Sequence, residues 1–261
     1  MLEAIFFDYD GTLAPTSQRQ EKWFQFYAER NTKEWPFNSF EEFLDFYNKH
    51  CGRSGGVQNV YDALGLPCDM KDRKHPVWPA YEEFNQNNPQ ELYQGMKETI
   101  EKIWMLGSLA KEYHKNRRLR LGINTTNSWK SIYADLKHGG ILPYFDCFIT
   151  EEVLRQYQGM GNSEPLQKPS TISLALLLET IDSKGASTLH VGDTRNDLRA
   201  SQKVMRLNPA HPETLITVGA CYGYEGRARL EQGVETPEGK VYFDYLIDTP
   251  QELTKIVEEL L

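Results

Sequence analysis

Residues 2–12 read LEAIFFDYDGT, an apolar run that ends abruptly in two aspartates and a glycine. The run LEAIFF has the length and the Ile and Phe content of a strand buried in a parallel sheet. Gly11 permits the tight turn that follows. Asp8 and Asp10 are therefore expected at the carboxyl end of a buried strand, which is the edge of such sheets where ligands bind.

Other apolar runs of similar length recur along the chain. They are LRLGI at 119–123, FDCFIT at 145–150, STLHV at 187–191, LITVGA at 215–220 and YFDYLI at 242–247. Between them, apolar residues follow at spacings of three and four, as in Ile100, Ile103 and Trp104, which is typical of amphipathic helices. Strand and helix in alternation predict an α/β fold with a doubly wound, mostly parallel, Rossmann-like sheet.

The stretch from residue 15 to residue 94 interrupts this alternation. It lacks β-like runs and shows helical spacing instead, as in Trp23, Phe26 and Tyr27. We therefore expect an all-helical domain at 15–94, inserted into a core formed by 1–14 and 95–261. Its many aromatic residues would fill the interior of a small helical bundle; alternatively, some of them would form a wall that shapes a substrate pocket.

Composition narrows the class of protein. The chain has 261 residues, of which 39% are hydrophobic and 25% charged, a globular balance. It has no long uncharged apolar stretch and no basic leader, so neither membrane insertion nor export is expected. The four cysteines lie far apart, which favours reduced thiols in the cytoplasm.

A net charge of -8 argues against nucleic acid as a partner. The one basic cluster, Lys115, Arg117, Arg118 and Arg120, is interpreted as a solvated helix end.

Four acidic residues are predicted to meet at one edge of the sheet. Asp8 and Asp10 follow the first strand, and Asp193 and Asp197 occur in GDTRND (192–197), directly after STLHV. Such carboxylates repel one another unless a cation holds them together, and Mg²⁺ prefers oxygen ligands of this kind. Asp193 is the stronger candidate for a metal ligand, because Asp197 could equally cap the helix that begins there.

The same residues suit phosphoryl transfer. Asp8 could attack phosphorus to form an aspartyl-phosphate, while Asp10 could protonate the leaving oxygen and later deprotonate water. Lys168, in QKPS, could neutralise Asp8 and the phosphoryl oxygens together, although a surface lysine is the alternative. Thr125, Thr126 and Asn127 follow LRLGI and could donate to a phosphate oxygen, with strand alternation favouring Thr125 over Thr126.

Four short motifs resemble, in their order along the chain, those of the haloacid dehalogenase superfamily of phosphotransferases: DYDGT, TT, KP and GDTRND. LYQGM (92–96), YFDCFITEEV (144–153) and YFDYLIDTPQEL (242–253) resemble landmarks of its phosphoglycolate phosphatase and β-phosphoglucomutase branch. The resemblance implies that the 15–94 insert is a helical cap that closes over the site. CGRSGG (51–56) resembles the cap loop that faces the core, and Arg53 within it is a candidate for reading substrate charge or, alternatively, a solvated arginine.

The resemblance also assigns roles to single residues. Asp8 would be the nucleophile, Asp10 the acid and base, Thr125 the phosphate-oxygen donor, and Lys168 the charge neutraliser. Mg²⁺ would be held by the Asp8 side chain, the Asp10 carbonyl and Asp193. Asp197 would bind the metal through water or orient Lys168, and Gly11, Thr126 and Asn127 would line the phosphate site.

The expected activity is magnesium-dependent hydrolysis of a small phosphorylated metabolite, with no membrane partner. A phosphomutase uses the same acids and is the alternative, although Thr12 leans towards the phosphatases. A dehalogenase is disfavoured because halide displacement needs neither a second acid at position 10 nor a metal. A binding protein that kept the fold without the chemistry is the alternative of another class.

Overall fold

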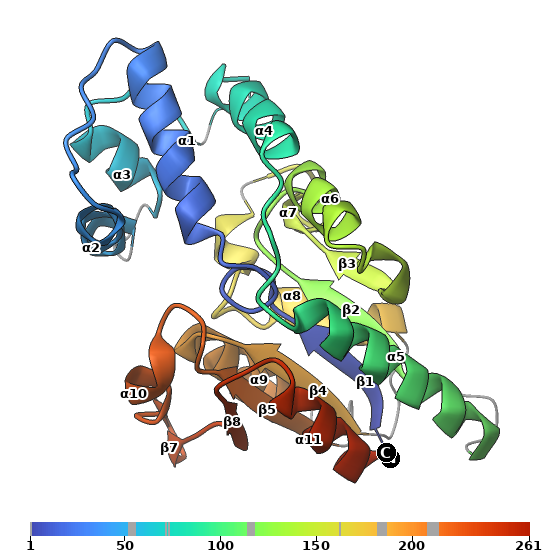
Figure 1. The fold of residues 1–261 in the computed structure, drawn as a ribbon. Coiled ribbons are helices and arrows are strands. Elements are labelled where there is room, and N and C mark those ends of the chain that lie inside the picture. The colour runs from blue at the N-terminus through green and yellow to red at the C-terminus, as the bar shows by residue number, and fades with distance from the viewer. Residues whose placement is uncertain are drawn as a thin grey trace. The chain divides into compact units, whose positions relative to one another are not determined.

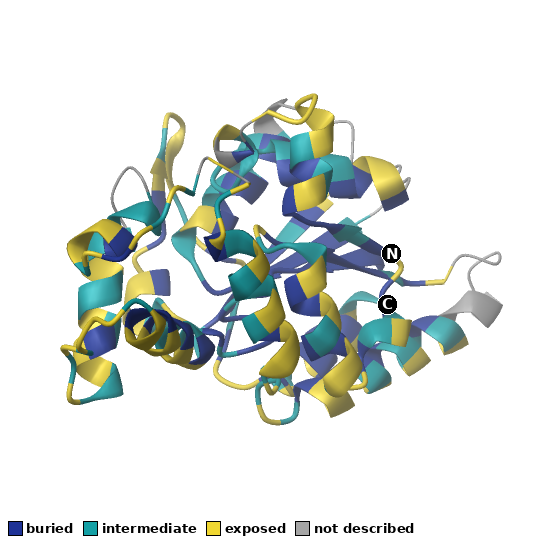
Figure 2. Ribbon diagram, turned by 90° about the horizontal axis from the view of Figure 1, so that it is seen from above, coloured by how far each residue is buried: buried dark blue, intermediate teal, exposed yellow. Residues whose placement is uncertain are grey.

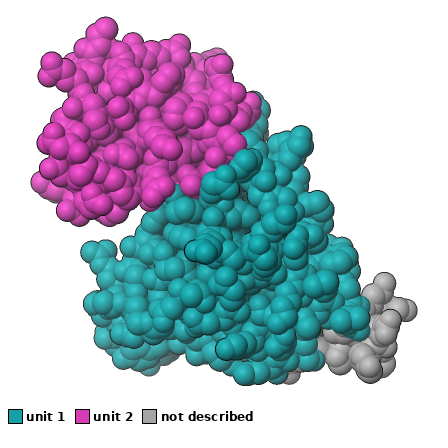
Figure 3. Space-filling model, viewed as in Figure 1, with its two compact units in different colours: residues 1–15, 91–261 teal, residues 16–90 magenta. Residues whose placement is uncertain are grey.

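The computed structural model describes residues 2–51, 56–70, 72, 74–113, 118–161, 163–181, 187–207 and 214–261. It divides the chain into two compact units (Figure 3). Unit 1 comprises Met1–Pro15 and Glu91–Leu261, and unit 2 comprises Thr16–Gln90. The division made from the sequence, at 14/15 and 94/95, lies close to these boundaries.

Unit 1 contains a parallel sheet of six strands in the order β3-β2-β1-β4-β5-β8 (Figure 1). The strands are β1 (Leu2–Phe7), β2 (Arg120–Asn124), β3 (Cys147–Ile149), β4 (Ser187–Gly192), β5 (Thr214–Ala220) and β8 (Tyr245–Ile247). The first strand lies in the middle of the sheet, and all six of its residues are buried. The α/β fold predicted from the sequence is thereby confirmed.

Helices cover both faces of this sheet (Figure 1). On one face lie α5 (Met96–Tyr113), α6 (Trp129–His138) and α11 (Glu252–Leu260); on the other lie α7 (Glu151–Tyr157), α8 (Ile172–Ile181) and α9 (Arg195–Leu207). Successive residues of β1 alternate between the two cores, with Ile5 and Phe7 in the first and Ala4 and Phe6 in the second. The strands are therefore almost wholly buried, whereas the helices alternate buried and exposed residues (Figure 2).

The described part of unit 2 contains α1 (Ser17–Arg30), α2 (Phe40–Cys51), α3 (Gln58–Ala63) and α4 (Val77–Asn87). Its core is aromatic: the rings of Trp23 and Tyr27 stack with centroids 5.0 Å apart, and those of Phe24 and Tyr61 lie 4.7 Å apart. The Trp23 indole N–H donates to the Tyr61 hydroxyl at 2.7 Å. These aromatic side chains pack the interior of unit 2, because each buries a large apolar area and the polar groups of Trp23 and Tyr61 bond to each other.

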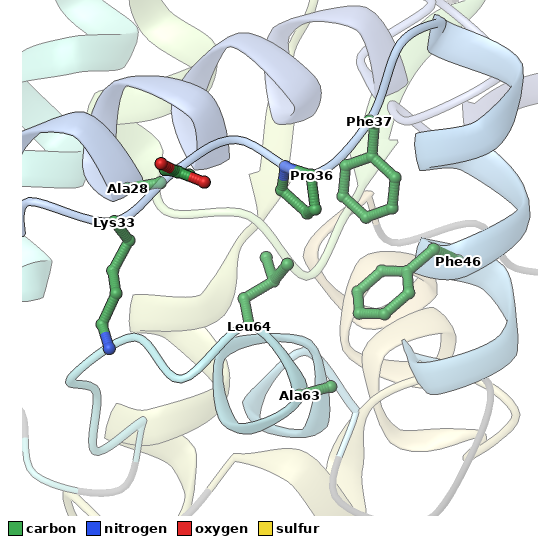
Figure 4. A pocket seen from close by; sticks show the side chains of 8 residues that line it. Ala28, Lys33, Pro36, Phe37, Phe46, Ala63 and Leu64 are labelled. Carbon is green, nitrogen blue, oxygen red and sulfur yellow. The ribbon is translucent and has the colours of Figure 1, made fainter.

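Unit 2 also has an open, largely apolar hollow of about 350 Å³. It is lined by Ala28, Lys33, Glu34, Pro36, Phe37, Phe46, Ala63 and Leu64. Figure 4 shows Phe37 and Phe46 at one end of the hollow and Lys33 at the other. All of its lining residues belong to unit 2, whereas the residues that the sequence assigns to catalysis belong to unit 1.

The polar stretch 226–241 contains regular structure. It holds α10 (Gly226–Leu230) and an antiparallel hairpin of β6 (Val234–Thr236) and β7 (Gly239–Val241). Most of its residues are exposed, but Leu230 and Val234 are buried against Leu198 and Phe243. These apolar contacts hold the stretch against α9.

Two short 3₁₀ turns, η1 (Leu142–Tyr144) and η2 (Glu164–Leu166), complete the described elements. Within the described ranges, no helix combines the length and the apolar character needed to cross a bilayer.

Candidate active site

Three neighbouring strands bring the predicted site residues to one edge of the sheet. Asp8 follows β1, Thr125 follows β2 and Asp193 follows β4, and β1 pairs with both of the other strands. The Asp8 N–H continues the ladder by donating to the Val191 carbonyl at 2.9 Å, and the Thr125 N–H donates to the Ile149 carbonyl at 2.9 Å. Backbone hydrogen bonds therefore fix both residues beyond the ends of their strands.

Lys168 lies between two of the acids. Its Nζ is 2.5 Å from Asp8 Oδ1, 2.8 Å from Asp197 Oδ1 and 3.4 Å from the Asn124 carbonyl. The Lys168 side chain is 9% exposed and that of Asp197 is 1% exposed. One buried ammonium thus bridges two buried carboxylates.

Burial and charge act against each other on these groups. Burial raises the pKa of Asp8 to about 7, although Lys168 opposes the rise. Burial would lower the pKa of Lys168, but Asp197 and Asp8 outweigh it and hold that pKa above its ordinary value. Burial would likewise raise the pKa of Asp197, yet Lys168 holds it below its usual range. The Lys168–Asp197 pair is therefore charged at neutral pH.

Asp193 forms no ion pair with a lysine or arginine among the residues that the structure describes. Burial, followed by the charges of Asp8 and Asp197, raises its pKa well above the ordinary value. Asp8, Asp193 and Asp197 offer carboxylate oxygens within 4.8 Å of one another, and all three residues are buried. Three hard oxygen donors facing one ammonium fit a divalent cation such as Mg²⁺, because it would offset the excess negative charge.

Two loops hold Asp193 in place. Its Oδ1 accepts from the Thr12 hydroxyl at 3.3 Å, and its Oδ2 accepts from the Tyr224 backbone N–H at 2.7 Å. Gly11 and Gly223 leave no room for side chains: a Cβ on Gly11 would lie 2.1 Å from Asp193 Oδ2, and one on Gly223 would lie 2.2 Å from Asp193 Cβ. Both glycines therefore let backbone approach this carboxylate closely.

Replacing Gly11 with Ala is expected to lower both stability and activity. Gly11 has a φ of 75°, so a side chain there costs roughly 1–2 kcal/mol, and the added Cβ would also displace the Asp193 carboxylate. Gly226→Ala is the matched control, since Gly226 has a φ of 68° but no atom near a built Cβ. Thermal unfolding should show a loss in both variants, whereas hydrolysis assays should show a loss only in Gly11→Ala. Equal activities in the two variants would contradict the steric argument.

Asp10 and Asn127 meet across the site. The Asn127 amide donates to Asp10 Oδ2 at 2.7 Å, and the Asn127 backbone N–H donates to the Thr125 hydroxyl at 3.1 Å. Thr125 is buried and Thr126 is exposed. The structure thus puts Thr125 inside, as strand alternation suggests. Arg53, the predicted reader of substrate charge, lies outside the described residues.

Sequence reasoning missed two contributors to the site. The first is the loop CYGYEG (221–226), whose Tyr224 N–H bonds Asp193 and whose Glu225 pairs with Arg195 at 2.9 Å. It directly follows β5, so the strand-end argument applied to the other motifs would also have identified it. The second is Tyr9, whose hydroxyl donates to the buried Asp135 of α6. No signal in the sequence links these two residues, which lie far apart in the chain.

Comparison with known proteins agrees with this geometry. The sequence pattern of the haloacid dehalogenase-like hydrolase family matches residues 5–205. The chain belongs to this family, and the resemblance drawn from the four motifs is confirmed. Asp8, Lys168, Asp193 and Asp197 all fall within the matched range.

Individual relatives resemble the chain over nearly its whole length. The pyrophosphatase PpaX of Bacillus mycoides (strain KBAB4) is 24% identical over 265 residues, covering 99% of this chain and 98% of that protein. The structure of CbbY from Rhodobacter sphaeroides in complex with phosphate has a TM-score of 0.63 at 21% identity, with coverage of 97% and 96%. The HAD hydrolase YfnB of Bacillus subtilis, bound to magnesium, has a TM-score of 0.64 at 18% identity, with 98% of each chain covered.

Proposed function

We propose that this chain is a magnesium-dependent phosphatase that hydrolyses a small phosphorylated metabolite through an aspartyl-phosphate on Asp8. One observation carries the proposal: Asp8 is buried at a strand end, 2.5 Å from the Lys168 ammonium and within 4.8 Å of Asp193 and Asp197. Burial disfavours the charged form of Asp8, and the neighbouring Lys168 opposes that effect, which favours the carboxylate that a nucleophile needs.

The reaction would proceed in two displacements. An Asp8 carboxylate oxygen forms a bond to phosphorus while the phosphorus–oxygen bond to the leaving group breaks, and Asp10 gives a proton to the leaving oxygen. Asp10 then takes a proton from water, whose oxygen bonds to phosphorus and releases phosphate from Asp8. Asp10 serves as acid and then as base, as general acid–base catalysis requires.

The other polar residues would orient the phosphoryl group and balance its charge. Lys168 neutralises Asp8 and the phosphoryl oxygens together, while Thr125, Thr126, Asn127 and the Gly11 turn offer hydroxyl and amide donors. Asp8, Asp193 and the Asp10 carbonyl would hold Mg²⁺, with Asp197 acting through water or through Lys168. The bound ion would supply positive charge where anions must meet.

We further propose that unit 2 acts as a cap that excludes water and contacts the leaving group, with Arg53 reading substrate charge. Lids that sequester a reaction in this way are common among enzymes. The substrate of the enzyme would be a small phosphate ester or anhydride, since PpaX is a pyrophosphatase and CbbY binds phosphate.

The wild-type protein is expected to hydrolyse a generic aryl phosphate with added Mg²⁺ and to lose that activity in EDTA, regaining it with excess Mg²⁺. Asp193→Asn should raise the Mg²⁺ concentration needed for half-maximal rate by roughly 10- to 100-fold, because it removes one charged ligand. Asp248→Asn is the control, since Asp248 is a surface acid paired with Arg227.

Phosphate release, followed across a panel that includes pyrophosphate and sugar phosphates, identifies the substrate class. Transfer of the phosphoryl group within a sugar phosphate, without phosphate release, would instead support the mutase alternative. Wild-type protein that is inactive on the whole panel, yet binds phosphate esters, would support the binding-protein alternative and overturn the proposal.

A further inference from the structure

His190 is a buried polar residue that the proposed chemistry does not use. It lies on β4, on the same sheet face as Phe6 of β1, and is 1% exposed. Its Nδ1 is 2.7 Å from the Ser201 hydroxyl of α9. Its Nε2 has no hydrogen-bond partner in the part of the chain that the structure describes. An imidazole buried this way costs free energy that an aliphatic side chain would not, so its presence needs a reason.

The free ring nitrogen faces the active site. His190 Nε2 is 4.0 Å from Asp197 Oδ1, the same oxygen that lies 2.8 Å from Lys168 Nζ. Asp197 and Ser201 are four residues apart on α9 and so project from one face of that helix. One turn of α9 thus contacts both ends of the imidazole, the Ser201 hydroxyl at Nδ1 and the Asp197 carboxylate near Nε2.

This geometry selects one form of the ring. A neutral imidazole carries a single proton, on either Nδ1 or Nε2. A proton on Nε2 points its positive end at the Asp197 carboxylate, whereas a bare Nε2 would point a lone pair at it. We therefore expect the Nε2–H form, in which Nδ1 accepts a hydrogen bond from the Ser201 hydroxyl.

A continuous polar chain then runs from the sheet interior to the nucleophile. It passes from Ser201 through His190, Asp197 and Lys168 to Asp8. We propose that His190 is a positioning residue, which holds the Asp197 carboxylate and through it sets the Lys168 ammonium against Asp8. The inference rests on the proposed function of the site and names a residue that acts through Asp197 without touching substrate.

Three replacements of His190 separate its two hydrogen-bonding ends. Gln places an amide N–H where Nε2 lies, Asn places one where Nδ1 lies, and Leu keeps the volume without either group. His190→Leu and His190→Asn are expected to lower kcat by roughly 10- to 100-fold with little change in KM. In both variants Lys168 keeps its charge, but Asp197 no longer holds it in position against Asp8. His190→Gln is expected to retain most of the wild-type rate. Equal rates in the Gln and Leu variants would overturn the inference.

A second measurement does not depend on activity. In crystal structures of the variants, the distance from Lys168 Nζ to Asp197 Oδ1 should stay near 2.8 Å in His190→Gln and lengthen in His190→Leu. Nitrogen-15 NMR of wild-type protein should show the proton on Nε2. If wild type hydrolyses nothing, the proposed function fails, while these two readouts still decide the role of His190. An unchanged distance from Lys168 Nζ to Asp197 Oδ1 in His190→Leu, or a proton on Nδ1 of wild-type His190, would refute the positioning role of His190.

Ser201→Ala guards against failure of the His190 variants to fold. It removes the donor to Nδ1 and leaves the ring in place, so the tautomer preference should weaken and kcat should fall by less than in His190→Leu. Wild-type kcat together with an unchanged NMR signature in this variant would show that the chain of contacts does not extend to Ser201.

Discussion

Replacing Asp8 with Asn is expected to reduce kcat by on the order of 10⁴-fold or more, because no other group can form the bond to phosphorus. Asn has nearly the shape of Asp and can still contact Lys168, so substrate binding should survive. The measurement is steady-state hydrolysis of an aryl phosphate. Mass spectrometry of quenched wild-type protein should also find one phosphoryl group on the peptide that contains Asp8, and none in the variant.

Folding of Asp8→Asn serves as the control. Asp8 has a folded-state pKa raised to about 7, so its negative charge costs stability increasingly as the pH rises above the ordinary pKa of Asp. The amide removes that cost, while Lys168 loses one of its two carboxylates and keeps Asp197. These effects oppose each other, and the circular dichroism spectrum should be that of wild type. Full activity in a folded Asp8→Asn protein would exclude Asp8 as the nucleophile.

Replacing Lys168 with Met is expected to damage both stability and activity. Removing one partner of a buried ion pair leaves uncompensated charge, which costs about 3–5 kcal/mol, and here Asp8 and Asp197 would both be left. Loss of the charge that stabilises the phosphoryl group should lower kcat by on the order of 10²–10³-fold. Urea unfolding and steady-state kinetics measure the two effects. Lys102→Met is the matched control, since Lys102 pairs with Glu258 on the surface, where each side chain is about half exposed, and such pairs contribute about 0–1 kcal/mol.

The pH dependence of this stability loss has a definite sign. The pKa of Lys168 is raised in the folded protein, so its stabilising contribution is complete below the ordinary pKa of Lys and fully present at neutral pH. Without Lys168, burial would raise the pKa values of Asp8 and Asp197, and lowering the pH would relieve the variant by protonating them. The difference in unfolding free energy between wild type and Lys168→Met should therefore be larger at pH 7.5 than at pH 5. A difference that grows on acidification would contradict the buried-pair interpretation.

Much of the fold could be predicted from local sequence, because buried parallel strands are short apolar runs. LEAIFF coincides with β1, and LITVGA and STLHV lie entirely within β5 and β4. YFDYLI extends beyond the three residues of β8 because Phe243 packs against Leu198, Leu230 and Val234 instead of joining the sheet. Such contacts between distant segments also pack α10 and the β6–β7 hairpin against α9. The spacing of residues along the sequence does not reveal them.

Asp8, Asp193 and Lys168 could be located because Asp8 and Asp193 directly follow strands and Lys168 precedes α8, each within a recognisable motif. The contacts that hold these side chains in place were harder to predict. The Tyr224 N–H that holds Asp193 is a backbone group, which any residue could supply. His190 sits inside an otherwise apolar run, where the sequence shows only a strand residue; its contact with Ser201 depends on how α9 packs against β4.

The place of β1 has a consequence for how the chain is made. This strand is synthesised before residues 16–90 and before every other strand of the sheet, yet it lies at the centre, between β2 and β4. During translation its five apolar residues remain without the strands that cover them, which begin at Arg120 and Ser187. Unit 2, by contrast, has its own aromatic core. We therefore expect the inserted unit to fold first on the ribosome, and the nascent β1 to be the segment that holdase chaperones protect until the catalytic edge can form.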